Sequence, residues 1–442
     1  MYNTKDLNDF FNHHLDQVNH PKKIIVGYSG GLDSTVLLYS LTRINLNIPI
    51  LAIHINHQQH HLSSEWEKFC INTAKVFGVK LISEKIQIEK KLGKATECEM
   101  RDHRYKVLRK YIEPNDWLMT AHHKNDQAET LLLSILRGSG VDGLSGIKPI
   151  RIFADGMLLR PLLGYSKAEL INYAKIKNLE WIEDFSNEDN SFDRNFLRNK
   201  IIPQLEKRWP SINKRFYKVT SLALEASERS EDIAKIDLFS IGNDKYIDSE
   251  KFIKLSDNRQ RNLIRFILRM KNLQHPSYKQ LVDGTKALRL IINGDKNKYI
   301  KLPDANIYNY RKKLYVIPQL SIQNNESLNL FPNKTIYLNN GMGSISLKKA
   351  KDTGIDPRIL QDGLKVSFRV GGEVIKPSGK KHHYKLKKLF QEYKIYPWMR
   401  GRIPLLFYGN EIVSVGNLWI AEKFSKSKGY IIKWYQKPEL ND

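Results

Sequence analysis

Apolar and polar positions follow two periodicities along the first two hundred residues. Four short apolar or β-branched runs predict strands, at residues 23–28, 49–55, 79–88 and 116–121. Four longer stretches with helical composition follow these runs, at residues 34–41, 63–77, 96–111 and 126–137. Strands that alternate with helices of this length are typical of βαβ units. We therefore predict an α/β fold with a buried parallel sheet.

The pattern changes further along the chain. Residues 165–230 are mostly helical in character, and residues 236–318 mix helices with short segments that could be strands. A polar tract at residues 319–335 is typical of a linker. The last hundred residues show short alternating runs divided by Gly and Pro, which predict a small α+β domain dominated by strands. The predicted divisions are a parallel-sheet domain, a helical linker with a mixed middle domain, and the α+β domain, at residues 1–205, 206–325 and 336–442.

Composition narrows the functional classes. The 442 residues carry a formal net charge of +25, which favours a polyanionic partner, nucleic acid before an anionic membrane surface. No apolar run approaches the roughly 18 residues that span a bilayer, and the first residues lack the apolar core of a secretory signal. Cys70 and Cys98 are too few for a disulfide framework or a Cys₄ zinc site. These features predict a soluble, cytoplasmic protein that does not enter the membrane.

The stretch Gly27–Ser34 (GYSGGLDS) lies between the first predicted strand and the first predicted helix. Glycines at such a turn let the backbone approach a ligand closely, and N–H groups at a helix start point toward an anion. The hydroxyls of Ser29 and Ser34 add donors for phosphate oxygens. Asp33 would repel phosphate unless a cation lay between them, so we predict a phosphate site with Mg²⁺ at Asp33.

Other interpretations of this loop fit less well. A Walker loop requires Gly-Lys-Ser/Thr, which does not follow here. Residues 27–31 match the G-x-S-x-G nucleophile elbow of α/β-hydrolases, but that fold has strands before the elbow, and only about twenty residues precede this one. The structural alternative is a glycine turn capped by Ser and Asp, which the complete SGGLDS pattern in this position disfavours.

His122, Asp126 and Glu129 have the i, i+4, i+7 spacing of one helix face, and they follow the fourth predicted strand. In an open parallel sheet, ligands bind at the carboxyl ends of the strands. A pair of carboxylates facing the phosphate loop would suit a second metal contact. Without a cation between them, the negative charges of Asp33 and Asp126 would repel each other. The structural alternative is a solvated helix face with a capping aspartate.

Arginines supply further candidates. Arg101 and Arg104 lie three residues apart on one predicted helix face, and either could bind a triphosphate or an RNA backbone through two parallel hydrogen bonds. Pairing with neighbours such as Glu97 explains each of them nearly as well. Arg160 and Arg198 are weaker candidates.

Four histidines, His54, His57, His60 and His61, lie close together near the end of the second predicted strand. They suggest a metal site, but no acidic or thiol partner accompanies them. Their spacing also does not fit an H-x₃₋₅-H pair within a four-ligand set. The role of this run stays open.

The SGGxDS loop at the end of a first strand resembles the mark of the PP-loop, or N-type, ATP pyrophosphatases. Further segments resemble the tRNA(Ile)-lysidine synthetases within that group, at residues 101–105, 120–130, 137–140, 143–146, 160–163, 181–187 and 194–198. Near the other end, segments similar to that family's C-terminal domain lie at residues 368–373, 386–390 and 397–400. The middle of the chain shows little resemblance to the family. The family usually has a Gly and a basic residue just after the position of His57, where Gln58, Gln59 and His60 stand here.

The resemblance implies a ligase that acts on the wobble cytidine of tRNA(Ile) with a CAU anticodon. ATP would activate the C2 carbonyl oxygen, and free L-lysine would then attack C2 to form lysidine, with release of pyrophosphate and AMP. It implies catalytic roles for Asp33 and Asp126. Arg101, Arg104, His122 and Glu129, which their helical spacing singles out, are the candidates for binding substrate or phosphate. The implied ATP-binding residues are Ser29, Gly30, Gly31, Leu32, Asp33 and Ser34.

The C-terminal region suits the same partner. Residues 331–442 contain 21 lysines and arginines but nine acids, and several of the lysines lie beside aromatic residues. Basic side chains with aromatic neighbours suit phosphate contacts and base stacking, although a merely solvated lysine face is the alternative. The predicted tRNA contacts are Arg198, Lys380, Lys381, Lys385 and Lys388. A homodimer is compatible with these features.

Two rival functions remain. A tRNA sulfur-transferase of the same PP-loop group usually carries paired cysteines or a cluster, and Cys70 and Cys98 form no C-x-x-C pair. The other rival is a non-catalytic RNA-binding protein that retains an ATP-binding fold. Release of AMP, or exchange of pyrophosphate into ATP, separates this second rival from an active ligase.

Overall fold

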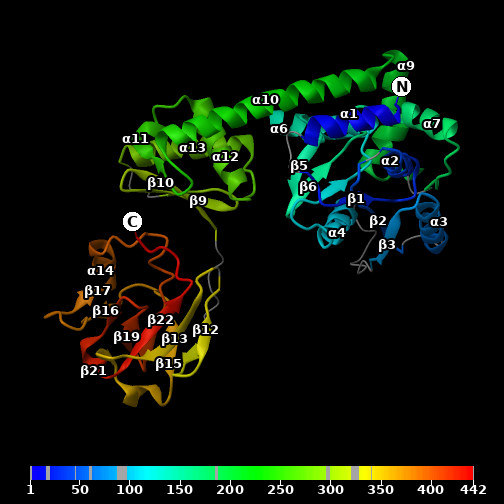
Figure 1. Cartoon of the computed structure of the whole chain (residues 1–442). Helices are drawn as coiled ribbons and strands as arrows, with labels where there is room; N and C mark the ends of the chain where they lie inside the picture. Colours follow the sequence, from blue (N-terminus) through cyan, green and yellow to red (C-terminus); the bar gives the residue numbers. More distant parts are fainter. Residues whose placement is uncertain are drawn as a thin grey trace. The chain divides into compact units, whose positions relative to one another are not determined.

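The computed structural model describes residues 2–15, 20–44, 46–58, 62–86, 97–184, 188–294, 299–319, 328–339 and 341–441. These residues divide into two compact units, Met1–Ser230 and Glu231–Asp442 (Figure 1). The two-unit division does not test the three predicted domains, which stay a prediction. None of the described helices is both long and apolar enough to cross a membrane.

A six-stranded sheet forms the centre of the first unit, in the order β3-β2-β1-β4-β6-β5. All neighbours pair in parallel except β5 and β6, which form an antiparallel pair at one edge. The predicted α/β class with a parallel sheet is therefore confirmed, although the sequence pattern missed the β5–β6 pair. The strands are β1 (Ile24–Gly27), β2 (Ile50–Asn56), β3 (Lys80–Lys85), β4 (Trp117–Met119), β5 (Ile150–Phe153) and β6 (Gly156–Leu159).

Helices cover both faces of this sheet (Figure 1). Ile24 and Val26 of β1 face a core that includes residues of α1, α2 and α7, whereas Ile25 faces a second core with residues of α4. Because both faces are covered, β1 is a continuous apolar run rather than an alternating one. The helices of the unit are α1 (Thr4–Leu15), α2 (Leu32–Thr42), α3 (Ser63–Val76), α4 (Glu97–Arg109), α5 (Lys124–Leu136), α6 (Val141–Leu144), α7 (Lys167–Ile176), α8 (Asp193–Phe196), a π-helical turn (Leu197–Ile201) and α9 (Ile202–Arg208). Helix α10 (Ile212–Ile241) begins in this unit and ends in the second.

The order of the strands creates a site at the centre of the sheet. Strands β1 and β4 are neighbours, but the chain continues from β1 to β2 on one side and from β4 toward β6 on the other. Such a reversal of direction leaves a crevice at the carboxyl ends of the two strands, where open α/β sheets bind ligands. The loops that follow β1 and β4 are the two stretches for which the sequence predicts chemistry.

The second unit contains a mixed layer followed by an all-antiparallel region. A four-stranded sheet, β7-β10-β9-β8, packs with α12 and α13 around a shared core. Its elements are β7 (Ile247–Asp248), α11 (Ser249–Phe252), α12 (Asp257–Met270), α13 (Tyr278–Ile292), β8 (Tyr299–Lys301), β9 (Ala305–Tyr310) and β10 (Lys313–Pro318).

In the described part of the C-terminal region, two five-stranded antiparallel sheets and the antiparallel pair β16–β17 accompany one short α-helix, as the predicted α+β domain requires. The predicted linker at residues 319–335 is only partly correct, because residues 328–330 form β11, which pairs with β15; residues 320–327 lie outside the described part. The elements are β11 (Leu328–Leu330), β12 (Thr335–Tyr337), β13 (Ser344–Lys349), β14 (Thr353–Ile355), β15 (Leu364–Ser367), β16 (Val374–Ile375), β17 (Tyr384–Lys385), α14 (Leu386–Glu392), β18 (Leu405–Tyr408), β19 (Glu411–Val415), β20 (Trp419–Ile420), β21 (Ser425–Ser427) and β22 (Tyr430–Tyr435).

Candidate active site

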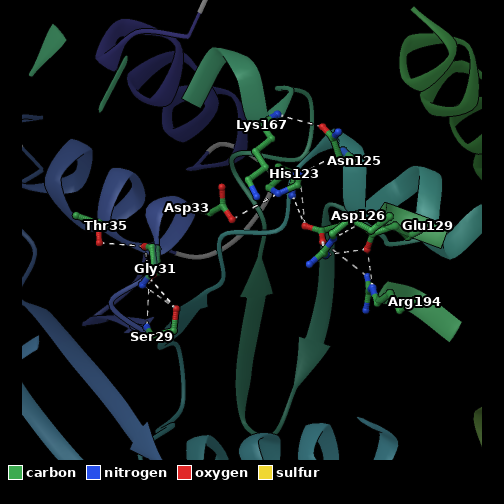
Figure 2. A network of polar contacts seen from close by, with 12 residues as sticks. Ser29, Gly31, Asp33, Thr35, His123, Asn125, Asp126, Glu129, Lys167 and Arg194 are labelled. Atoms are coloured by element: carbon green, nitrogen blue, oxygen red, sulfur yellow. Dashed lines mark hydrogen bonds and ion pairs between the residues drawn. The ribbon is translucent and has the colours of Figure 1, made fainter. Parts of the chain in front are cut away.

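The glycine-rich loop connects the end of β1 to the start of α2 at Leu32. The Ser29 and Ser34 hydroxyl oxygens lie 3.0 Å apart, and the Gly31 N–H donates to Ser29 Oγ at 3.3 Å. Thr35 Oγ1 donates to the Gly31 carbonyl at 3.0 Å, which fixes the loop against the first turn of α2 (Figure 2). The loop is thus held in shape by its own hydroxyl groups, with the start of a helix directly behind it, as binding of phosphate requires.

Gly30 is the residue of this loop that must be glycine. Its φ is +82°, and a Cβ atom there would lie 2.7 Å from both Cys70 Sγ and Ile182 Cδ1. The Gly30 carbonyl also accepts a hydrogen bond from the Ile182 N–H at 2.9 Å. Cys70 is fully buried, so its side chain supports the loop from below rather than facing solvent.

Replacing Gly30 by alanine is expected to lower the free energy of unfolding of the N-terminal unit by about 2–4 kcal/mol, because left-handed backbone strain and overpacking add together. Urea denaturation followed by tryptophan fluorescence measures this change. Gly31→Ala is the matched control: φ at Gly31 is −73°, and an added Cβ would meet Ser29 Oγ at an ordinary 3.5 Å. Equal losses in the two variants would contradict the assigned role of Gly30.

The second cluster is built around His123, which the sequence pattern did not single out. Helix α5 begins at Lys124 and His123 caps it: the Asn125 N–H donates to His123 Nδ1 at 3.2 Å, and the His123 N–H donates to Asp126 Oδ2 at 2.9 Å. Because Nδ1 accepts a hydrogen bond, the ring proton of the neutral imidazole lies on Nε2. That atom is 3.5 Å from Asp33 Oδ2, so His123 lies between the aspartates of the two loops (Figure 2).

The proposed helix face was wrong for His122, because His122 precedes the helix. Its Nδ1 lies 2.9 Å from Thr120 Oγ1 instead. Asp126 and Glu129 do lie on α5, one turn apart. The expected close approach of Asp33 and Asp126 is also modified, since the His123 imidazole separates them.

Glu129 is completely buried, and its carboxylate accepts hydrogen bonds from two arginines. Figure 2 labels one of them, Arg194. Arg194 Nε donates to Glu129 Oε2 at 2.8 Å, and Arg198 Nε donates to Glu129 Oε1 at 2.6 Å. The same guanidinium groups reach Asp126 Oδ1 at 3.8 Å and 3.4 Å. Sequence reasoning missed Arg194 as a site residue and assigned Arg198 to tRNA. Their i, i+4 spacing on one helical stretch was the available indication that they act together.

These contacts set the protonation of the cluster. Burial by itself would raise the pKa of Asp126, but His123, His122 and Arg194 outweigh it and hold that pKa far below its usual range. Burial would lower the pKa of His123, yet Asp126 and Asp33 raise it. At neutral pH, Asp126 is therefore ionised, and the pKa of His123 lies above that of an ordinary imidazole.

Asp33 has the chemistry of a cation ligand. Its Oδ1 is buried and has no hydrogen-bond partner among the described residues, while its Oδ2 faces His123. A lone unsatisfied carboxylate oxygen next to a phosphate loop fits Mg²⁺, which usually takes one or two carboxylates together with substrate phosphates and water. In the described part of the chain, no three His, Cys, Asp or Glu side chains gather as a metal-binding group.

The predicted basic candidates lie in different surroundings. Arg101 and Arg104 face the ring of Tyr105, with guanidinium carbons 5.3 Å and 5.6 Å from its centroid, and neither pairs with a carboxylate among the described residues. The proposed partner Glu97 has a side chain outside the described part. Arg160 is buried, and its Nη1 donates to the Lys148 carbonyl.

The histidine run and the C-terminal lysines were the remaining candidates. His54 Nδ1 lies 3.1 Å from the Tyr28 carbonyl, and His60 and His61 lie outside the described residues. In the second unit, Lys380 lies 4.9 Å from the Tyr384 ring centroid and 3.7 Å from Glu392, whereas the other predicted lysines are exposed. Those exposed lysines are Lys381, Lys385 and Lys388. Their contact with tRNA stays a prediction.

Comparison with known proteins places this site in a family. Family models match at residues 3–205 (PP-loop domain), 248–315 (TilS substrate binding domain) and 364–434 (TilS substrate C-terminal domain). A tRNA(Ile)-lysidine synthase of Coxiella burnetii is 33% identical over 412 residues, or 92% of this chain and 91% of that protein. The chain belongs to the tRNA(Ile)-lysidine synthase family. A second relative of that name, from Buchnera aphidicola subsp. Schizaphis graminum, is 34% identical over 435 residues, covering 95% and 96% of the two chains.

Membership of this family makes the chain a tRNA-modifying ligase with an ATP-binding PP-loop domain, and it confirms the resemblance predicted from the motifs. Among solved structures, a U34-tRNA thiolase from Methanococcus maripaludis aligns over 51% of this chain and 80% of its own, at 18% identity and a TM-score of 0.41. The middle of the chain, where the sequence offered little resemblance, has a family match of its own.

Proposed function

We propose that this member of the family joins free L-lysine to C2 of the wobble cytidine of tRNA(Ile) with a CAU anticodon. The observation that carries the proposal is the meeting of two loops at one switch point. One loop, Ser29–Ser34, is suited to phosphate. The other leads from β4 into α5 and brings the imidazole of His123 and, in the first turn of the helix, the ionised Asp126 to the same place. ATP and a second, cationic substrate would therefore lie side by side.

The proposed reaction has two steps. The cytidine C2 carbonyl oxygen attacks the α-phosphorus of ATP, and pyrophosphate leaves to give an adenylated tRNA. The amine of lysine then attacks C2, and AMP departs with the former carbonyl oxygen while the amine loses a proton. The phosphate loop would stabilise the negative charge of the leaving pyrophosphate, and bound Mg²⁺ would supply further charge neutralisation there, with Asp33 as its protein ligand.

The second loop suits the lysine. Asp126, with its pKa far below the usual range, is a poor proton acceptor and is better suited to hold an ammonium group. His123, whose pKa is raised by the two aspartates, is the better candidate to take a proton from the attacking amine. Glu129 would act through Arg194 and Arg198, by fixing the position of the carboxylate cluster.

The test is incorporation of labelled lysine into an unmodified transcript of tRNA(Ile) with the CAU anticodon, with ATP and Mg²⁺ present. We expect incorporation that depends on ATP and that is abolished when the wobble cytidine is changed to uridine. Production of AMP and pyrophosphate in equal amounts should accompany it. Labelled lysine that stays free, or incorporation into the uridine transcript, would refute the proposal.

Size-exclusion chromatography with light scattering tests the predicted homodimer in the same preparation.

The C-terminal lysines give a separate prediction about binding. Replacing Lys380, Lys381, Lys385 and Lys388 with alanine is expected to weaken binding of cognate and non-cognate tRNA alike, because phosphate contacts do not read sequence. The slope of log affinity against log salt should flatten by roughly 0.7–0.9 for each phosphate group that the variant no longer neutralises. Affinity for ATP should not change. An unchanged slope in tRNA titrations at several salt concentrations would leave these lysines as a solvated surface.

A further inference from the structure

Arginine and aromatic side chains alternate across α4 and the edge strand β5. The Tyr105 and Phe153 rings are in contact, with centroids 5.5 Å apart. The Arg151 guanidinium carbon lies 5.4 Å from the first ring and 5.9 Å from the second. The Arg109 guanidinium carbon lies 5.6 Å from the Phe153 ring, and Arg101 and Arg104 face Tyr105. We call this surface the arginine–aromatic strip; its members are Arg101, Arg104, Tyr105, Arg109, Arg151 and Phe153.

The positive charge of the strip is not neutralised within the described part of the chain. None of its four arginines forms an ion pair with a carboxylate among the residues that the structure describes. The effect is visible on Tyr105: burial would raise its pKa, but Arg101, Arg104 and Arg160 lower it below the usual value. Guanidinium groups stacked on rings keep their N–H groups directed outward, where they suit a planar or tetrahedral oxyanion.

The strip runs outward from the active site. At its inner end, Arg104 lies within electrostatic range of Asp126 and Arg194, and Arg101 lies within range of His122. At its outer end, Arg109 and Arg151 are exposed, and Arg151 belongs to the outermost strand of the sheet. The ATP phosphates have their own loop after β1, so the outer arginines are not needed for ATP.

We propose that the arginine–aromatic strip binds the phosphate backbone of the tRNA anticodon arm next to the reacting nucleotide. This inference rests on the proposed function: the reacting cytidine must lie between the glycine-rich loop and Asp126, and Arg104, at the inner end of the strip, lies within electrostatic range of Asp126. The RNA chain that continues from that nucleotide must leave the site over a neighbouring surface. A row of arginines without carboxylate partners among the described residues, with exposed outer members, offers the complementary charge. The Tyr105 and Phe153 rings pack against the core beneath the sheet and hold these guanidinium groups in place. Charged side chains on an edge strand often serve to prevent pairing with another chain. That role would explain Arg151 on β5, but it would not explain Arg109, which lies on α4.

The decisive variant is Arg109→Gln with Arg151→Gln, because both side chains are exposed and neither belongs to the candidate catalytic or ATP-binding residues. The probe is a fluorescent anticodon stem-loop RNA, titrated against the full chain at several salt concentrations without ATP or lysine. We expect weaker binding and a log–log salt slope flatter by roughly 1.4–1.8, equivalent to two phosphate contacts. The CAU stem-loop and one with another anticodon should be affected equally.

Two further variants make the result specific. Arg109→Lys with Arg151→Lys keeps both charges and should retain the salt slope, which a general loss of folding would not allow. The double variant Lys175→Ala with Lys177→Ala removes the same amount of charge from exposed positions at the end of α7. That helix packs on the opposite face of the sheet from α4, so this variant should leave stem-loop binding unchanged.

An unchanged slope in the glutamine variant, or an equal loss in the α7 variant, would overturn the proposal. Weaker binding of ATP by the glutamine variant would also overturn it, because the strip would then serve the nucleotide. Lysine incorporation by the wild type is measured separately, so failure of the proposed function and failure of this inference are distinguishable.

Discussion

Replacing Asp33 by asparagine is expected to lower the rate of tRNA adenylation at least about a hundredfold while leaving the fold intact. The change keeps the shape of the side chain but removes the charge. Asp33 Oδ1 has no hydrogen-bond partner among the described residues, so the native fold loses no hydrogen bond there. What disappears is the negative charge that would hold Mg²⁺ beside the phosphates.

Two measurements separate this role from a structural one. The first is tRNA-dependent AMP formation at ordinary Mg²⁺ concentrations. The second is the increase of Tm on addition of ATP. In the wild type this increase should be larger with Mg²⁺ than with a chelator, because a ligand stabilises the folded state that binds it. Asp33→Asn should abolish that difference.

Asp9→Asn, an exposed change on α1, is the matched control and should behave as the wild type. Near-normal turnover of Asp33→Asn, or a chelator effect that persists in it, would contradict the assigned role. A Tm that is already much lower without ATP would instead make Asp33 a structural residue of the loop.

The strand–loop–helix arrangement of the glycine-rich stretch could be predicted from sequence because all of its determinants are local. Ser29, Ser34 and the glycines follow a buried strand within a few residues, and their hydrogen bonds remain within the same turn. Residues 405–408 and 411–415 belong to the short runs that the sequence predicts as strands near the C-terminus, and they form the neighbouring antiparallel strands β18 and β19.

The centre of the site could not be predicted in this way. His123 was overlooked because its importance depends on where α5 begins and on Asp33, which lies ninety residues earlier in the chain. Helical spacing favoured His122, which lies outside the helix. Arg194 was missed because its partner Glu129 belongs to another helix, so that no local pattern joins them. Residues 328–330 likewise became a strand only through pairing with β15.

Replacing Glu129 by glutamine is expected to destabilise the N-terminal unit. Glu129 is fully buried, and its two oxygens accept hydrogen bonds from Arg194 and Arg198. Removing its charge leaves the two guanidinium groups facing Asp126, which lies at longer distances of 3.8 Å and 3.4 Å. Breaking a buried ion pair from one side costs several kcal/mol. Because both arginines are partly exposed and Asp126 remains, we expect a loss of about 3 kcal/mol.

Hydrogen exchange measured by mass spectrometry on peptides from α5 and β4 reports this unit independently of the other one. A loss of about 3 kcal/mol should reduce the protection of these peptides by roughly a hundredfold. Glu225→Gln is the matched control, since Glu225 is 61% exposed and pairs with Arg229 on the surface of α10. Its effect should be about 0.5 kcal/mol or less.

Glu129→Gln and Glu129→Asp together decide what Glu129 does in the reaction. If it acts by holding Arg194 and Arg198, loss of protection and loss of lysine incorporation should appear together, and both should be smaller in Glu129→Asp, which keeps the charge. Full protection in Glu129→Gln with no lysine incorporation would show that Glu129 contacts a substrate directly. Glu129 would then take part in the reaction together with Asp126, instead of only holding the two arginines in position.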